Sequence, residues 1–146
     1  MPEEEGSKIL DVAVALIERD GRYLISQRLP EDSFGGFWEF PGGKCRPGEM
    51  LEECFVREIQ EELDVLISVG AIFQTVEHQY PHRTIRLHFF SCRILKGEPQ
   101  TIECTAWRWV LPQEMFQYQF PPASAPIIEA LMKRGNYDLQ KKETTP

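Results

Sequence analysis

Hydrophobic and polar positions along the first forty residues follow patterns that are typical of short β-strands. Ile9 to Glu18 is rich in valine, alanine and isoleucine and predicts a largely buried strand. Asp20-Gly21 favours a hairpin turn, so Tyr23 to Gln27 is predicted to be the next strand. Phe37 to Phe40 predicts a short aromatic strand, which we expect Pro41-Gly42-Gly43 to interrupt.

The hydrophobic period changes to that of a helix after the turn at Pro47-Gly48. Large apolar residues then recur at every fourth position and define one face: Leu51, Phe55, Ile59 and Leu63. This spacing predicts an amphipathic helix that ends near Asp64.

The second half of the chain predicts more strands and a terminal helix. Two long strands, Leu66 to Glu77 and Thr84 to Leu95, are predicted on either side of a Tyr80-Pro81-His82 turn. They are followed by a predicted strand from Thr105 to Val110, a short helix or turn after Leu111-Pro112, and a helix from Ala125 to Arg134. This order predicts the α+β class, with a mixed β-sheet between helices. Residues 1–146 are expected to form a single domain with flexible ends at 1–8 and 138–146.

Composition and charge narrow the classes of function. A formal net charge of −7 argues against stable binding of nucleic acid or of an anionic membrane. The sequence has no apolar run long enough to span a membrane and begins with the acidic MPEEEGSK, so we expect a cytoplasmic protein. The cysteines form no C-x-x-C pair, and we expect four unpaired thiols in a reducing compartment: Cys45, Cys54, Cys92 and Cys104.

The predicted helix carries three carboxylates on one arc. Glu58, Glu61 and Glu62 stand at i, i+3 and i+4, which places them within roughly 100° of one another around a helix. Like charges at this spacing repel, so the carboxylates are either solvated or bind divalent cations. Arg57 can act as a solvated countercharge or can hold one of the carboxylates in place by paired hydrogen bonds.

The spacing around this arc is similar to a known motif. The pattern G-x5-E-x7-R-E-hydrophobic-x-E-E-x-G-hydrophobic is the signature of the Nudix hydrolases. Here it consists of Gly43, Glu49, Arg57, Glu58, Ile59, Glu61, Glu62 and Val65. One position departs from the pattern, because Asp64 stands where a glycine is expected. Aspartate tolerates the left-handed conformation better than most residues, so we interpret Asp64 as a mild change at the end of the helix.

The resemblance extends beyond the motif to the MutT-type branch of the family. The similar segments are WEFPGGK (Trp38 to Lys44), YPHRTIRLHFF (Tyr80 to Phe90), GEP (Gly97 to Pro99) and FPPAS (Phe120 to Ser124). The resemblance implies the Nudix α/β/α sandwich and a nucleoside triphosphate pyrophosphohydrolase, which releases a nucleoside monophosphate and pyrophosphate. Nucleotide-pool sanitation, as with 8-oxo-dGTP, is the first function that it implies.

The resemblance also implies roles for individual residues. The carbonyl of Gly43 and the carboxylates of Glu58, Glu61 and Glu62 would coordinate Mg²⁺, with Mn²⁺ as a substitute, while Arg57 orients the carboxylates. Glu61 and Arg57 therefore belong to the catalytic set. Glu103 lies six residues before Trp109, which is the position of a further glutamate in this branch, so it is the candidate to activate water or complete the metal site. An exposed loop glutamate is the alternative.

Three residues outside the motif are candidates for binding the substrate. Arg28 is either directed at the nucleotide or a surface arginine at a strand end, and Glu39 either lies near the pocket or faces solvent. Ser124 replaces the asparagine by which this branch commonly reads a damaged purine, and it can instead cap the terminal helix. Pyrimidine nucleotides (CTP, dCTP, 5-methyl-dCTP) and other nucleoside diphosphate derivatives are therefore alternative substrates.

A Nudix module that binds a nucleotide without cleaving it is the rival from another class. Such modules tend to lose glutamates of the motif, whereas this chain keeps them all. We expect a small nucleotide as the partner, no stable binding of nucleic acid or membrane, and a monomer or homodimer.

Overall fold

The structure, a computed structural model, describes residues 8–144, with side chains described as far as residue 135. The contacts between residues divide the chain into two compact units, which are described separately. The first unit contains residues 8–17 and 40–103, and the second contains residues 18–39 and 104–144. No helix among the described residues is long and apolar enough to cross a membrane.

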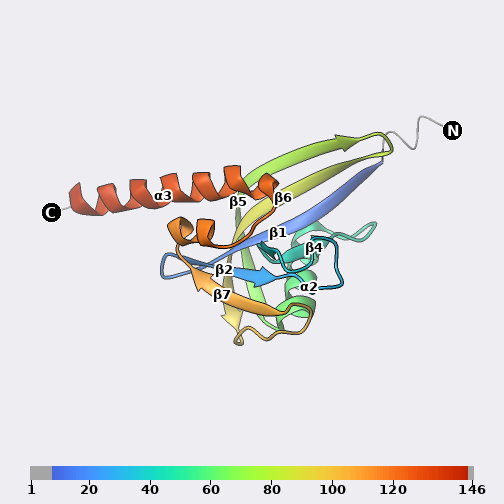
Figure 1. Cartoon of the computed structure of the whole chain (residues 1–146), viewed down its shortest axis with the longest axis horizontal. Helices are drawn as coiled ribbons and strands as arrows, with labels where there is room; N and C mark the ends of the chain where they lie inside the picture. Colours follow the sequence, from blue (N-terminus) through green and yellow to red (C-terminus); the bar gives the residue numbers. More distant parts are fainter. Residues whose placement is uncertain (1–7, 145–146) are drawn as a thin grey trace. The chain divides into compact units, whose positions relative to one another are not determined.

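The first unit is built on a mixed sheet. Strand β1 (Ile9–Arg19) pairs in parallel with β6 (Arg83–Lys96), from Ile9 opposite Thr84 to Ile17 opposite Cys92. The other side of β6 pairs antiparallel with β5 (Leu66–Tyr80), and the two form the long green and yellow hairpin in Figure 1. The mixed sheet and the strands expected on either side of the Pro81-His82 turn are confirmed, although both strands are longer than expected.

Helix α2 (Leu51–Leu63) packs its apolar face on this sheet. Phe55, Ile59 and Leu63 are fully buried, and the ring of Phe55 lies 5.1 Å from that of Phe90 on β6. The period of four read from the sequence therefore identifies the buried face correctly. Beside this buried face lie Glu58 and Glu61, which are partly exposed, whereas Glu62 is buried.

Strand β4 (Gly42–Lys44) begins within the interruption that we expected at Pro41-Gly42-Gly43. It pairs antiparallel with β1, with Ala13 opposite Gly43. The strand forms because glycine allows a close approach of the two backbones: a Cβ on Gly42 would overlap the carbonyl oxygen of Ala13. The predicted break is confirmed, since β3 ends at Glu39, but the sequence did not predict that Gly42 and Gly43 begin a further strand, whose pairing places Gly43 beside helix α2.

The second unit contains a smaller antiparallel arrangement. Strand β2 (Arg22–Gln27) pairs with the end of β1, with β3 (Trp38–Glu39) and with β7 (Ala106–Val110). The predicted turn at Asp20-Gly21 is confirmed, and both of its residues have positive φ. Two short 3₁₀ helices follow β7 and lead into the terminal helix: η1 (Pro112–Gln117), η2 (Pro122–Ser124) and α3 (Ala125–Thr144).

Helix α3 is longer than the predicted span of Ala125 to Arg134 (Figure 1). It continues to Thr144, so residues 138–144, which we expected to form a flexible polar end, are helical. The continuation is explained by residue types with good helix propensity, including Leu139, Gln140 and the two lysines after them, which outweigh the cost of Gly135. The flexible ends expected at residues 1–7 and 145–146 lie outside the described residues.

Two of the four cysteines are paired, contrary to the prediction of four unpaired thiols. Cys45, on the loop after β4, forms a disulfide with Cys54 in the first turns of α2, and their Cα atoms are 5.3 Å apart. Cys92 and Cys104 are buried and take no part in this disulfide. The sequence did not reveal the pair because the two cysteines are brought together by the loop that returns from β4 to α2.

Candidate active site

The guanidinium of Arg57 is the centre of an acidic cluster on helix α2. Its Nε and Nη2 donate to both carboxylate oxygens of Glu49, at 2.6 and 2.9 Å. Its Nη1 donates to Glu58 and to Glu61, each at 2.9 Å. Arg57 therefore holds three carboxylates together, which offsets the repulsion expected between Glu58 and Glu61.

This geometry fits the orienting role expected for Arg57. The side chain is only 18% exposed, and its Nη2 also donates to the backbone carbonyl of Lys44 at 3.1 Å. Its contacts therefore reach from the helix to the end of β4. The paired carboxylates raise the pKa of Arg57, so the guanidinium stays charged.

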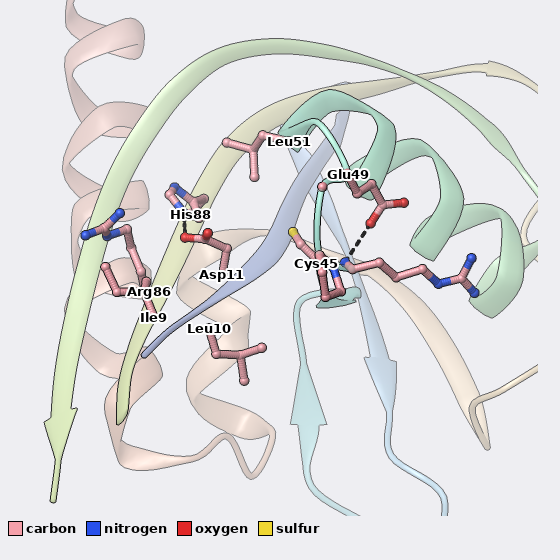
Figure 2. Close-up of a pocket in the computed structure, with 11 residues that line it drawn as sticks. Ile9, Leu10, Asp11, Cys45, Glu49, Leu51, Arg86 and His88 are labelled. Atoms are coloured by element: carbon pink, nitrogen blue, oxygen red, sulfur yellow. Dashed lines mark hydrogen bonds and ion pairs between the residues drawn. The ribbon is translucent and has the colours of Figure 1, made fainter. Parts of the chain in front are cut away.

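Glu49 is held in its ionised form. Its pKa is lowered to about 2, first by the hydrogen bonds from Arg57 and then by the N–H of Arg46, which donates to Glu49 at 2.9 Å (Figure 2). The sequence pattern by itself indicates no role for Glu49, although this residue occupies a fixed position of the motif. In the structure, both of its carboxylate oxygens accept hydrogen bonds from Arg57.

Gly43 and Glu58 are brought into direct contact. A Cβ at residue 43 would overlap the carboxylate of Glu58, so only glycine leaves that carboxylate in place. The pairing of β4 with β1 fixes Gly43, and the middle of helix α2 supplies Glu58. Two of the residues expected to form the metal site therefore lie side by side.

Glu62 differs from its neighbours in being buried. Its exposed fraction is 7%, and its backbone carbonyl accepts hydrogen bonds from the N–H groups of Ile102 and Glu103 at 3.3 and 3.2 Å. The N–H of Gln100 donates to the carbonyl of Leu63 at 2.8 Å. The loop that carries Glu103 is thus fastened to the carboxyl end of α2, with the Glu103 side chain exposed.

The end of α2 confirms the interpretation of Asp64. This residue adopts the left-handed conformation, with φ 55° and ψ 43°, at the C-cap. Its N–H donates to the carbonyl of Gln60 at 3.0 Å, and its side chain accepts from Gln60 Nε2 at 2.6 Å. The aspartate therefore takes the conformation that the motif usually reserves for glycine, and the helix keeps its length.

The cluster has the chemistry of a site for a hard divalent cation. Glu58, Glu61 and the carbonyl of Gly43 offer only oxygen atoms, which are the ligands that Mg²⁺ prefers. Within the described residues, no three side chains of His, Cys, Asp or Glu converge into a complete metal-binding group. Mg²⁺ is usually held by one or two carboxylates together with substrate phosphates and water, so this donor set fits a site that the substrate completes.

In the second unit, two of the predicted substrate-binding residues form an ion pair. Arg28 Nη1 donates to Glu39 at 2.8 Å, and Arg28 Nε donates to the carbonyl of Ser33 at 2.6 Å. Both charged side chains are 28% exposed, so neither is a simple surface residue. Burial raises the pKa of Glu39, and the neighbouring Arg28 opposes this shift only in part.

Ser124 is the last residue of η2, directly before α3. Its N–H donates to the carbonyl of Pro121 at 2.9 Å, and its side chain is half-buried. Across the described residues, no hydrogen bond from its hydroxyl to the first turn of α3 is seen.

Comparison with known proteins identifies the family. A model of the NUDIX domain matches residues 12–130. The chain belongs to the NUDIX domain family. Its relatives include the CTP pyrophosphohydrolase of Escherichia coli K12, which is 38% identical over 86% of this chain and 93% of its own length. The 8-oxo-dGTP diphosphatase of Haemophilus influenzae is 32% identical over 86% of this chain and 93% of its own length.

A solved NUDIX structure supports the same assignment. The MutT protein of methicillin-resistant Staphylococcus aureus 252, described as a Nudix hydrolase, has a TM-score of 0.70 and 31% identity over 88% of this chain and 98% of its own. The α+β fold and the MutT-like branch are thus confirmed. This NUDIX chain is an enzyme that acts on phosphoric anhydride bonds.

Proposed function

We propose that the chain is a Mg²⁺-dependent nucleoside triphosphate pyrophosphohydrolase that converts NTPs or dNTPs and water into the monophosphate and pyrophosphate. The observation that carries this proposal is the cluster in which Arg57 binds both Glu58 and Glu61 while Glu58 lies against Gly43. The names of the relatives, which include a CTP pyrophosphohydrolase and an 8-oxo-dGTP diphosphatase, agree with it. Mn²⁺ is expected to substitute for Mg²⁺.

We assign each residue of the cluster a role in this reaction. Gly43, Glu58, Glu61 and Glu62 are proposed as the metal-binding residues. Bound Mg²⁺ would neutralise phosphate charge and lower the pKa of water. Arg57 keeps the carboxylates oriented, and Glu49 keeps Arg57 oriented. Glu103 is proposed to take the proton of the attacking water, since it is exposed on a loop whose backbone is fastened to Glu62.

Residues of the second unit are proposed to recognise the nucleotide and its base. Arg28, Glu39 and Ser124 are our candidates for binding the nucleotide. Removal of oxidised purine nucleotides such as 8-oxo-dGTP from the pool is the first candidate function. A pyrimidine triphosphate such as CTP or dCTP is the second, because the single hydroxyl of Ser124 cannot make the paired hydrogen bonds that an asparagine makes to guanine.

The experiment that tests the proposal is a substrate panel with identified products. Purified protein with Mg²⁺ is given 8-oxo-dGTP, dGTP, CTP, dCTP, 5-methyl-dCTP and ADP-ribose, and kcat/KM is measured for each. Release of a monophosphate and pyrophosphate is the expected result, and the ratio of kcat/KM for 8-oxo-dGTP to that for CTP separates the two candidate functions. Tight nucleotide binding by calorimetry without any product would instead identify a binding module.

The setting of the reaction follows from its substrate. We propose that the protein works in the cytoplasm, where nucleotide pools are kept, as a single NUDIX domain formed by both units. A small nucleotide is its proposed partner, and a monomer or homodimer is its proposed state. Sedimentation of the purified protein measures that state directly.

A further inference from the structure

The disulfide between Cys45 and Cys54 lies inside the NUDIX motif. The N–H of Cys45 donates to the carbonyl of Asp11 at 2.8 Å, so the loop end of the bond is anchored on β1. Cys54 is four residues before Glu58 on the same face of α2. The bond therefore ties the end of β4 to the helix that carries the acidic cluster.

The two cysteines differ in their accessibility. Cys45 lines a cavity of about 460 Å³ whose other walls include Asp11 and His88, which are hydrogen-bonded to each other at 2.8 Å (Figure 2). Cys54 is fully buried and does not line this cavity. A cavity of this size accommodates a small organic molecule, which would meet Cys45 rather than Cys54.

We propose that Cys45 and Cys54 form a thiol–disulfide exchange site that accepts a low-molecular-weight thiol through this cavity. The thiol sulfur attacks Cys45 Sγ, the bond between Cys45 and Cys54 breaks, and Cys54 leaves with the electron pair and is protonated. Cys45 then carries a mixed disulfide. A second thiol attacks the outer sulfur and releases the small disulfide, so two thiols are oxidised while the protein disulfide is reduced to two thiols.

The exchange reaches the proposed metal site through Gly43. Cys54 Sγ lies 3.9 Å from the carbonyl oxygen of Gly43, and the carboxylate of Glu58 packs against the same residue. Two separate thiols need more room than two bonded sulfurs, so reduction displaces either the loop of Cys45 or the first turns of α2. This coupling to Mg²⁺ rests on the proposed function, whereas the exchange itself does not.

Mass spectrometry of the intact chain tests the exchange. After purification without reductant, we expect a mass lower by two hydrogen atoms than that of the four-thiol form. Glutathione added to the native protein should give an adduct that peptide mapping places on Cys45, and dithiothreitol should restore the four-thiol mass. A four-thiol mass after air exposure, no reaction of the native disulfide, or an adduct on Cys54 would overturn the proposal.

Nucleotide hydrolysis at varied Mg²⁺ tests the coupling. The reduced protein is expected to need about fivefold or more Mg²⁺ for half-maximal rate than the oxidised protein. Cys45→Ser should behave like the reduced protein in both buffers, while the control Cys92→Ala, which keeps the disulfide, should respond like the wild type. Equal Mg²⁺ requirements in all these forms would contradict the coupling.

The mass measurements and the hydrolysis assay distinguish a failure of the exchange site from a failure of the proposed function. If no substrate is hydrolysed in either redox state, the proposed function is contradicted, and the mass measurements still decide the exchange. If hydrolysis is robust and the native disulfide never exchanges, only the exchange site is wrong. Hydrogen exchange of the amides in residues 43–58 gives a further readout, since reduction is expected to speed exchange there.

Discussion

The carboxylate of Glu58 lies against Gly43 and occupies the place that any β-carbon at residue 43 would take. The contact joins strand β4 to helix α2 and explains in steric terms why a glycine stands at the start of the motif. Substitution of Gly43 by alanine is expected to displace the Glu58 carboxylate. Since small displacements of catalytic groups are costly, kcat/KM should fall by about a hundredfold while the far-UV circular dichroism stays unchanged. The neighbouring variant Lys44→Ala, with its side chain at the surface, should stay near the wild-type rate.

The carboxylates of Glu61 and Glu62 are expected to be needed for turnover. Glu61→Gln and Glu62→Gln keep the shape of the side chain and remove the charge that would bind the cation. We expect kcat to fall by about a hundredfold or more in each, since metal ions contribute several kcal/mol to transition-state stabilisation. Glu52→Gln, on the exposed side of the first turn, is the control with the same change of charge. Near-native activity of either variant at saturating Mg²⁺ would remove that residue from the metal site.

The pairing of Glu49 with Arg57 predicts a pH dependence of stability. The pKa of Glu49 is about 2 in the folded chain, below its ordinary value of ~4.3. Between these two pKa values, the unfolded chain therefore binds more protons at this residue than the folded chain does. The contribution of the Glu49–Arg57 pair to the free energy of unfolding is complete above this pH range and is lost as pH falls toward 2. Glu49→Gln should lower the Tm at neutral pH, and its difference from wild type should shrink in acid. Thermal unfolding in metal-free buffer, with Glu52→Gln as the control, measures this; a difference that grows in acid would refute it.

Asp64 is expected to tolerate glycine and to reject a β-branched residue. Glycine adopts the left-handed conformation without steric cost, so Asp64→Gly should change the free energy of unfolding by less than about 0.5 kcal/mol. Valine at this position pays the penalty of that conformation, and Asp64→Val should destabilise the chain by about 1–2 kcal/mol. Urea unfolding of the two variants provides the comparison. Equal stabilities would mean that the C-cap conformation does not constrain the residue.

Ser124 is expected to influence the choice of base. Asparagine adds both a donor pair and an acceptor, so Ser124→Asn should raise the ratio of kcat/KM for 8-oxo-dGTP to that for CTP. One additional hydrogen bond is worth about 1 kcal/mol, which corresponds to roughly a fivefold change in the ratio. Ser124→Ala, which adds no hydrogen-bonding group, is the matched control. A ratio that is unchanged in both variants would place residue 124 away from the base.

Much of the architecture could be read from the sequence because it is local. The period of four in α2, its end at Asp64 and the turn at Asp20-Gly21 each depend on a few neighbouring residues. The extra strand β4 could not be read in this way, because its pairing with β1 depends on residues far away in the chain. The length of α3 was underestimated: the predicted helix ends at Arg134, whereas the helix continues through residues of good helix propensity to Thr144.

The sequence by itself determined the family and the reaction class, because the spacing of the glutamates, Arg57 and Gly43 can be recognised without knowledge of the fold. Only the tertiary structure decided how these residues cooperate. The loop from β4 to α2 turns back on itself, and this return brings Glu49 onto Arg57, Glu58 onto Gly43 and Cys45 onto Cys54. A helix sets the spacing of its own side chains, whereas contacts across a loop depend on where the sheet anchors its ends.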